Sequence, residues 1–231
     1  MKTIDALPGI GLEHLGPIFD EATATEYAWE LSNFMRDQVH GPVYEAAVNK
    51  GGFGLEFIKT SGAPSGTPGD IEWRVEAMRE NNVALPPAPP DHPNGTFREY
   101  IIARRLDSDG TTIKGRTALA GLLVVTKPQG ACTADVHQPS YIAEIDVAQD
   151  MYGTKLPLHL LNALRETHRE DPYVDMEAYR HNLRSQRFHG KLGFVFDNDT
   201  PPRDGTVYKG KWIRMHTTGA VFAERLQALL G

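Results

Sequence analysis

Residues 141–166 read YIAEIDVAQDMYGTKLPLHLLNALRE, and this stretch decides the fold. Apolar and polar residues alternate over 140–148, which predicts a strand. The leucines of 157–170 recur at helical spacing, and Pro157 is well suited to the first turn of a helix. The six residues DMYGTK (150–155) join the two elements. The sequence therefore predicts a strand end, a short turn and a helix start lying side by side.

This junction is a candidate anion site. The first backbone N–H groups of a helix lack partners within the helix and lie at the positive end of its dipole. Gly153 permits close approach of a ligand, Thr154 offers a hydroxyl and Lys155 a positive charge. Phosphates of a nucleotide cofactor suit such a place. The alternative is an ordinary strand-to-helix turn without a ligand.

The flanking sequence predicts further strands and helices. REYIIARRL (98–106) and TALAGLLVVTK (117–127) are joined by the turn DSDG and are typical of an antiparallel hairpin. After the junction we expect a strand at 173–179, a helix at 182–192, strands at 193–198 and 211–218, and a helix at 220–230. Before the hairpin we expect helices at 20–39 and 71–81 and Pro/Gly-rich loops at 60–70 and 85–96.

This order predicts an α/β (α+β) protein in which helices cover a mixed sheet. Residues 97–231 form the core, and residues 1–96 form an N-terminal helical and loop segment of the same domain. The sequence leaves open whether that segment packs on its own core or is exchanged between the subunits of a homodimer.

Composition excludes several classes of protein. The 231 residues carry 24 Lys+Arg against 30 Asp+Glu, a net charge of -6, so binding to nucleic acid is disfavoured and a membrane surface is not expected as a partner. The single cysteine, Cys132, allows neither an internal disulfide nor a thiolate zinc site, and no ligand spacing such as HExxH predicts a metal. No apolar run approaches the roughly 20 residues of a membrane span. We therefore expect a cytoplasmic protein.

A second stretch, AYRHNLRSQRFHGKLGF (178–194), follows the predicted fourth strand. Asn182, Ser185, Phe188 with His189, and the Lys191–Phe194 ending resemble the motif of the GNAT superfamily of acyl-coenzyme A-dependent N-acyltransferases. By motif, the resemblance covers about a quarter of the chain. It implies a splayed, mostly antiparallel sheet flanked by helices, with the pantetheine of acetyl-CoA or another acyl-CoA in the gap and its pyrophosphate on the turn after Val147. The positions it implies for cofactor binding are Val147, Ala148, Tyr152, Gly153, Thr154, Lys155, Asn182, Arg187 and Phe188.

The phosphate turn departs from the family pattern. Relatives usually carry Gln or Arg, then Gly, then Gly or Ala, where this chain has Tyr152, Lys155 and Pro157. Gly153 and Lys155 could restore close approach and charge, but Pro157 lacks an amide donor. Either the cofactor is held differently, or it is not coenzyme A. Arg184 and Arg187 are placed to approach a phosphate, although helix-surface arginines are usually solvated or ion-paired.

Three residues are candidates for catalysis. Strand alternation predicts that Glu144 and Asp146 share a face with Ile142, where either carboxylate could deprotonate an ammonium. The alternative is a salt bridge to Arg104, Arg105 or Arg116. His189 stands where many relatives carry a tyrosine that protonates the leaving thiolate, and a histidine can do the same work; the alternative is a partly exposed histidine without a role.

These observations predict an enzyme, an N-acyltransferase that moves an acetyl or related acyl group to an amine by direct attack. In this interpretation an N–H near Val147–Ala148 binds the thioester oxygen, and the acidic first half of the chain favours a cationic small-molecule amine. Two alternatives remain open. One is a degenerate GNAT-like module that binds a ligand or regulates without catalysis. The other is an acyltransferase with an unusual or carrier-protein donor.

Overall fold

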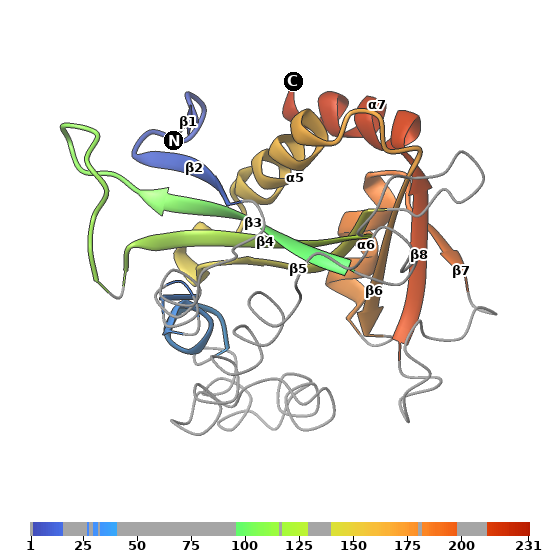
Figure 1. The fold of residues 1–231 in the computed structure, drawn as a ribbon, viewed down its shortest axis with the longest axis horizontal. Helices are drawn as coiled ribbons and strands as arrows, with labels where there is room; N and C mark the ends of the chain where they lie inside the picture. The colour runs from blue at the N-terminus through green and yellow to red at the C-terminus, as the bar shows by residue number, and fades with distance from the viewer. Residues whose placement is uncertain are drawn as a thin grey trace.

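The computed structural model describes residues 2–15, 27, 30–31, 33–40, 96–115, 117–128, 140–179, 182–197 and 212–231. Within them, one sheet has the strand order β1-β2-β3-β4-β5-β6-β8-β7 (Figure 1). Its strands are β1 (Lys2–Thr3), β2 (Ile10–Leu15), β3 (Thr96–Arg105), β4 (Leu119–Pro128), β5 (Ser140–Val147), β6 (Tyr173–Tyr179), β7 (Val195–Asp197) and β8 (Trp212–Thr218). The helices are η1, a π-helix (Met35–His40), η2, a 3₁₀ turn (Gln149–Met151), α5 (Leu156–Thr167), α6 (Leu183–Lys191) and α7 (Gly219–Leu230).

The mixed, mostly antiparallel sheet predicted from the sequence is confirmed. All neighbouring strands pair antiparallel except β5 and β6, which are parallel. The hairpin of β3 and β4, the junction from β5 to α5, and the elements after it lie where the sequence predicts them, with ends shifted by one or a few residues.

The N-terminal residues differ from the prediction. Residues 10–15 form β2, which pairs along β3 from Ile10↔Arg105 to Leu15↔Tyr100 and adds to the sheet edge. Helices and loops alone were expected there, because the six-residue strand IGLEHL contains a glycine and only a short alternating pattern. Residues 2–15 thus pack on the core of their own chain. The predicted helix at 71–81 and almost all of both Pro/Gly-rich loops lie outside the described residues, as do Arg116 and Cys132.

Two apolar layers enclose the sheet. α5 and α7 lie side by side over one face, and the helical residues between Tyr27 and His40 lie on the opposite face (Figure 1). Under α5 and α7, Leu160 and Phe222 pack with Leu123 of β4 in the larger cluster. On the other face, Leu31 and Phe34 pack with Ile102 and Leu122 in a smaller cluster. The described part of the predicted helix at 20–39 therefore buries an apolar stripe against the sheet.

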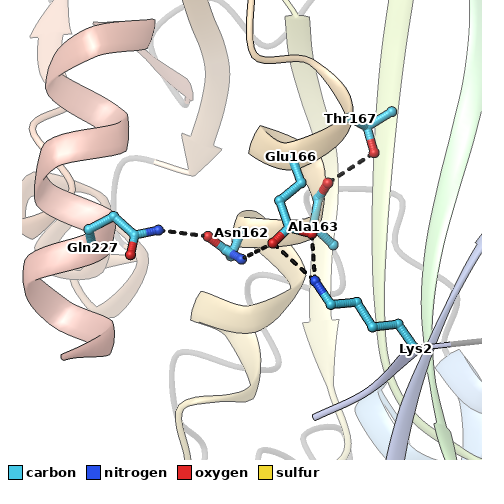
Figure 2. Close-up of polar contacts among 6 residues, drawn as sticks. All are labelled: Lys2, Asn162, Ala163, Glu166, Thr167 and Gln227. Atoms are coloured by element: carbon cyan, nitrogen blue, oxygen red, sulfur yellow. Dashed lines mark hydrogen bonds and ion pairs between the residues drawn. The ribbon is translucent and has the colours of Figure 1, made fainter.

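Polar contacts join β1, α5 and α7 across the outside of the first layer (Figure 2). The Lys2 ammonium lies 2.8 and 3.0 Å from the two carboxylate oxygens of Glu166. Asn162 donates to Glu166 and accepts from Gln227 of α7, both at 3.0 Å. Exposed ion pairs contribute little energy, so these contacts mainly fix how the elements are positioned.

A β-bulge changes which residues of β5 share a face. Val125 pairs with Ile142 and the next β4 residue, Val124, pairs with Glu144, so Ala143 is the extra residue. Alternation therefore slips by one position. Ile142, Ile145 and Val147 belong to the layer under α5, whereas Ala143 belongs to the opposite layer. The prediction that Glu144 and Asp146 share a face with Ile142 is wrong, because a bulge cannot be read from alternation.

The same strand separates from its other neighbour. β5 pairs with β6 at three positions only, Ser140↔Val174, Tyr141↔Asp175 and Ile142↔Met176. Beyond them β5 continues along β4 and β6 along β8. The carboxyl ends of the two parallel strands thus diverge and leave a gap in the sheet.

Two glycines test how tightly the helices pack. A Cβ on Gly219, at the start of α7, would lie 2.2 Å from the backbone oxygen of Asp171, whereas a Cβ on Gly190 in α6 would meet nothing within 4 Å. We expect Gly219→Ala to lower the free energy of unfolding by about 2 kcal/mol, because neither backbone can yield easily. Gly190→Ala should raise it by about 0.5 kcal/mol through helix propensity. Urea unfolding of both variants measures this, and equal effects would contradict the packing described.

Candidate functional site

A cavity of about 280 Å³ lies between the carboxyl end of β5 and α6, beyond the point where β5 and β6 part. β5 contributes residues 145–147, the following turn contributes Tyr152 and Pro157, and the start and first turns of α6 contribute the opposite wall. The lining residues are Val39, Ile145, Asp146, Val147, Tyr152, Pro157, Asn182, Arg184, Ser185, Phe188 and His189. The walls are therefore largely apolar, with a few polar groups placed among them, as in small-molecule sites.

The cavity brings together half of the site residues predicted from sequence. Asp146, Val147, Tyr152, Asn182, Phe188 and His189 line it. Glu144, Ala148, Gly153, Thr154, Lys155 and Arg187 do not. Sequence reasoning missed Val39, which lies more than 100 residues away along the chain, and preferred Arg187 to Arg184. The choice between those two arginines depends on which face of α6 is turned toward the cavity, and the motif alone does not give this.

The turn after β5 uses most of its polar groups internally. The amides of Tyr152 and Thr154 donate to Gln149 O and Met151 O at 3.1 and 3.2 Å. The Thr154 hydroxyl donates to Met151 O at 2.7 Å and accepts from Leu156 N at 3.3 Å. Gly153 has a φ of 83°, which glycine adopts without strain. The turn is thus tight, and several of its polar groups form hydrogen bonds within the turn itself.

Two predicted ligand contacts are already engaged elsewhere. The Lys155 ammonium donates to the backbone oxygen of Leu230 at 2.8 Å, where it caps the C-terminal end of α7. The Ala148 amide donates to Ala120 O at 2.9 Å. The Ala148 amide is thus used within the sheet, and the expected thioester contact from an N–H near Val147–Ala148 stays a prediction. The Lys155 ammonium has a structural contact within the protein.

Arg184 supplies the positive charge at this site. Its guanidinium carbon lies 4.6 Å from the centroid of the Tyr152 ring, a cation–π contact between α6 and the turn. Burial raises the pKa of the Tyr152 hydroxyl; the Arg184 charge opposes this and the Asp146 charge adds to it. Tyr152 is therefore protonated and neutral near pH 7.

The helix α6, which forms one wall of the cavity, is capped at its N-terminus. The Asn182 side chain accepts from the Ser185 amide at 3.1 Å, as an N-cap residue does. The spacing of Asn182 and Ser185 in the sequence motif thus has a structural explanation. Asn182 and Ser185 also line the cavity, so the cap holds the wall of the gap in place.

His189 is buried, with 1% of its surface exposed. Its Nδ1 donates to the Ser185 carbonyl at 2.8 Å, and its ring packs edge-on against Phe188 and Phe194. Nε2 has no hydrogen-bond partner among the residues that the structure describes. Burial lowers the pKa of His189 to about 4. The ring is therefore neutral near pH 7 and its one N–H is already donated, so it is not the partly exposed histidine that the sequence allowed.

Two of the three arginines considered as partners of the β5 carboxylates bind other acids. Arg104 forms ion pairs with Glu13 and Glu30, and Arg105 with Asp150. After the bulge, Glu144 and Asp146 lie on the face of β5 opposite to Ile142. Only Asp146 of the two lines the cavity.

We compared the chain with known proteins. Neither protein-family models nor curated protein sequences give a match. Among solved structures, an acetyltransferase from Thermus thermophilus is similar over 93% of this chain and 99% of its own, with a TM-score of 0.53 and 13% identity. The PaiA N-acetyltransferase from Thermoplasma acidophilum, in complex with coenzyme A, aligns over 90% and 99% with a TM-score of 0.48 and 10% identity. Nourseothricin acetyltransferase aligns over 52% of this chain and 65% of its own, with a TM-score of 0.38 and 20% identity.

The chain has the GNAT fold. The resemblance of the sequence motif implies a sheet that splays apart. The structure confirms this, because β5 and β6 pair at three positions only and then part. At 13% identity the similarity is one of fold. In the described part of this GNAT-fold chain, no three His, Cys, Asp or Glu side chains are grouped as metal ligands. No helix in that part is long and apolar enough to span a membrane.

Burial of His189 predicts a pH dependence of stability. Its pKa is about 4 in the folded protein and about 6.5 in an unfolded chain, so the unfolded state binds the proton more readily. Stability is unaffected by this group above about pH 6.5 and falls by on the order of 3 kcal/mol as the pH drops toward 4. His189→Phe keeps an aromatic ring and removes the titration. Urea unfolding at several pH values should show a shallower acid loss in the variant, and identical pH profiles would contradict this.

Proposed function

We propose that this protein is an N-acyltransferase that moves an acetyl or related acyl group from a coenzyme A thioester to an amine by direct attack. The observation that carries the proposal is the cavity between the carboxyl end of β5 and α6, which combines an apolar lining, a carboxylate and a cation. The extended thioester arm needs the apolar lining, the amine nucleophile needs the carboxylate as a base, and a phosphate needs the cation. Fold alone does not give this function, so the argument rests on the residues in the gap.

The cavity fits the arm of an acyl-coenzyme A donor. Ile145, Val147, Pro157 and Phe188 provide apolar contact. The polar groups of Asn182 and Ser185 lie among them, and Arg184 adds a cation. Such a donor would bring the reactive thioester; the chain's own groups would bind it and orient it.

Asp146 is the proposed general base. It lines the cavity, so it can take a proton from the ammonium of an incoming amine, directly or through one water. The amine nitrogen then attacks the thioester carbon, the nitrogen loses its second proton to solvent as the carbon–sulfur bond breaks, and the thiolate leaves. Glu144, on the same face but outside the cavity wall, is the weaker candidate.

His189 is better placed as part of the cavity wall than as the acid predicted from sequence. A neutral ring with its N–H on Ser185 has no proton to give at Nε2. A thiolate whose thiol has a pKa near 8.5 can leave and take its proton from water. We therefore assign protonation of the leaving group to solvent.

The proposed acceptor is a small cationic amine. Residues 1–150 carry 21 acidic against 12 basic side chains, a balance that attracts cations and not nucleic acid. A carboxylate at the cavity would favour the ammonium form of the incoming substrate close to the base.

One observation favours a second candidate function. Because the amides of Tyr152 and Thr154 and the Lys155 ammonium are engaged within the protein, the expected site for a nucleotide pyrophosphate is weakened. An acyltransferase that takes its acyl group from a carrier-protein thioester needs only the arm and one phosphate. A module that binds without catalysis is compatible with the same turn.

The test is thiol release from acetyl-CoA in the presence of a panel of polyamines, amino sugars and amino acids. Amine-dependent release of free thiol, with a mass increase of the acceptor by one acetyl group, would support the enzyme. Release with a loaded carrier protein but not with acetyl-CoA would favour the second candidate. Neither reaction, with an intact fold, would contradict acyl transfer.

Two isosteric changes separate the carboxylates. Asp146→Asn should lower kcat by about 100-fold or more, because general-base catalysis contributes on that order. Glu144→Gln, which removes the same charge two residues earlier on the same face, should change kcat by less than about threefold. Steady-state kinetics with the best amine checks both. A larger loss in the Glu144 variant would transfer the role of base to that residue.

A further inference from the structure

Arg184 of α6 lies over Tyr152, a residue of the turn that follows β5. The Arg184 guanidinium lies 4.6 Å above the Tyr152 ring and lines the same cavity. A cationic group of α6 thus lies next to this turn.

The two other candidate cations do not line this cavity. The Lys155 ammonium is bound to the carbonyl of Leu230 at the end of α7. Arg187, on the same helix as Arg184, is exposed and does not line the cavity. Among the described lining residues, Arg184 alone carries a permanent positive charge.

The contact with the Tyr152 ring leaves the N–H groups of Arg184 available. A cation–π contact uses the face of the ring and none of the guanidinium's hydrogen-bond donors, which can bind phosphate oxygens in pairs. No ion pair to a carboxylate is seen for Arg184 within the described residues; its contact there is the ring of Tyr152. Tyr152 therefore positions the cation without neutralising it.

We propose that Arg184, held by Tyr152, binds a phosphate of the acyl donor in place of the altered turn. This inference rests on the proposed function, since it assumes that a phosphopantetheine arm lies in the gap. The ligand chemistry is a phosphate ester attached to that arm. It is supplied either by coenzyme A or by the phosphopantetheine of a carrier protein.

The test compares two single-charge variants on one helix. Calorimetric titration with coenzyme A should show Arg184→Gln weakening binding by about tenfold or more, as expected for loss of a charge-assisted hydrogen bond. Arg187→Gln, which removes the same charge from the same helix, should bind within about twofold of the parent protein. Thermal unfolding of both variants shows that the fold is kept, as expected for exposed positions.

Three ligands locate the phosphate. Pantetheine, which has no phosphate, should bind the Arg184 variant and the parent equally. If 4′-phosphopantetheine shows the same loss as coenzyme A, Arg184 contacts the phosphate next to the arm, which both kinds of donor share. If only coenzyme A shows the loss, Arg184 contacts the nucleotide side and the free cofactor is the donor. Either result supports the phosphate site.

A second variant tests the role of Tyr152 as a positioning residue. Tyr152→Phe keeps the ring and should retain affinity for coenzyme A, whereas Tyr152→Ala should weaken it by about threefold. In the double variant with Arg184→Gln, the Tyr152→Ala change should have little further effect, because the group that it positions is gone. Fully additive losses would contradict the positioning role.

The outcomes distinguish this inference from the proposed function. Equal affinities of the Arg184 and Arg187 variants for every phosphate-bearing ligand would overturn the phosphate site and leave the acyltransferase standing. The phosphate site would also be overturned if the parent protein bound pantetheine as tightly as it binds coenzyme A. If the parent binds none of the three ligands, the proposed donor fails and the phosphate site fails with it.

Discussion

Three residue pairs join the two parts of the sheet. Ser140, Tyr141 and Ile142 of β5 pair with Val174, Asp175 and Met176 of β6, and beyond them the strands diverge. With so short a seam, the two parts need support from another layer. α5 and α7 provide it, because their apolar residues share one core with β4 on one side and β8 on the other. The gap can therefore stay open without loss of the fold.

The bulge at Ala143 and the end of this seam lie at the same place. Once β5 has shifted by one residue, Asp146 lies on the face opposite to Ile142 and also lines the cavity at the free edge of the strand. The opposite wall comes from α6, whose first turn is held by the Asn182 cap. Asp146 of β5 and Arg184 of α6 thus line one largely apolar cavity, and these are the charges that the proposed acyl transfer needs.

Local patterns predicted most of the fold and part of the site. The alternation of 140–148, Pro157 and the leucines after it predict the junction from β5 to α5, and the motif at 182–194 predicts the wall of α6. The face of Glu144 and Asp146 could not be predicted, since the bulge results from how β4 and β5 pair. The partners of Lys155 and Arg184 are equally non-local: one is Leu230 at the end of the chain, the other is Tyr152 on a different element. A sequence shows which side chains are charged, but it does not show which partners those side chains contact in the folded protein.

In the proposed function, an acyl donor enters the cavity between the carboxyl end of β5 and α6. Backbone amide NMR of the labelled protein titrated with coenzyme A tests it most directly. We predict shifts at Ile145–Val147 and Tyr152 on one side and at Arg184–His189 on the other. A second cavity of about 410 Å³, lined by His14, His159 and Asn162, is the internal reference. Shifts confined to that cavity, or binding that leaves both walls of the gap unchanged, would contradict the account.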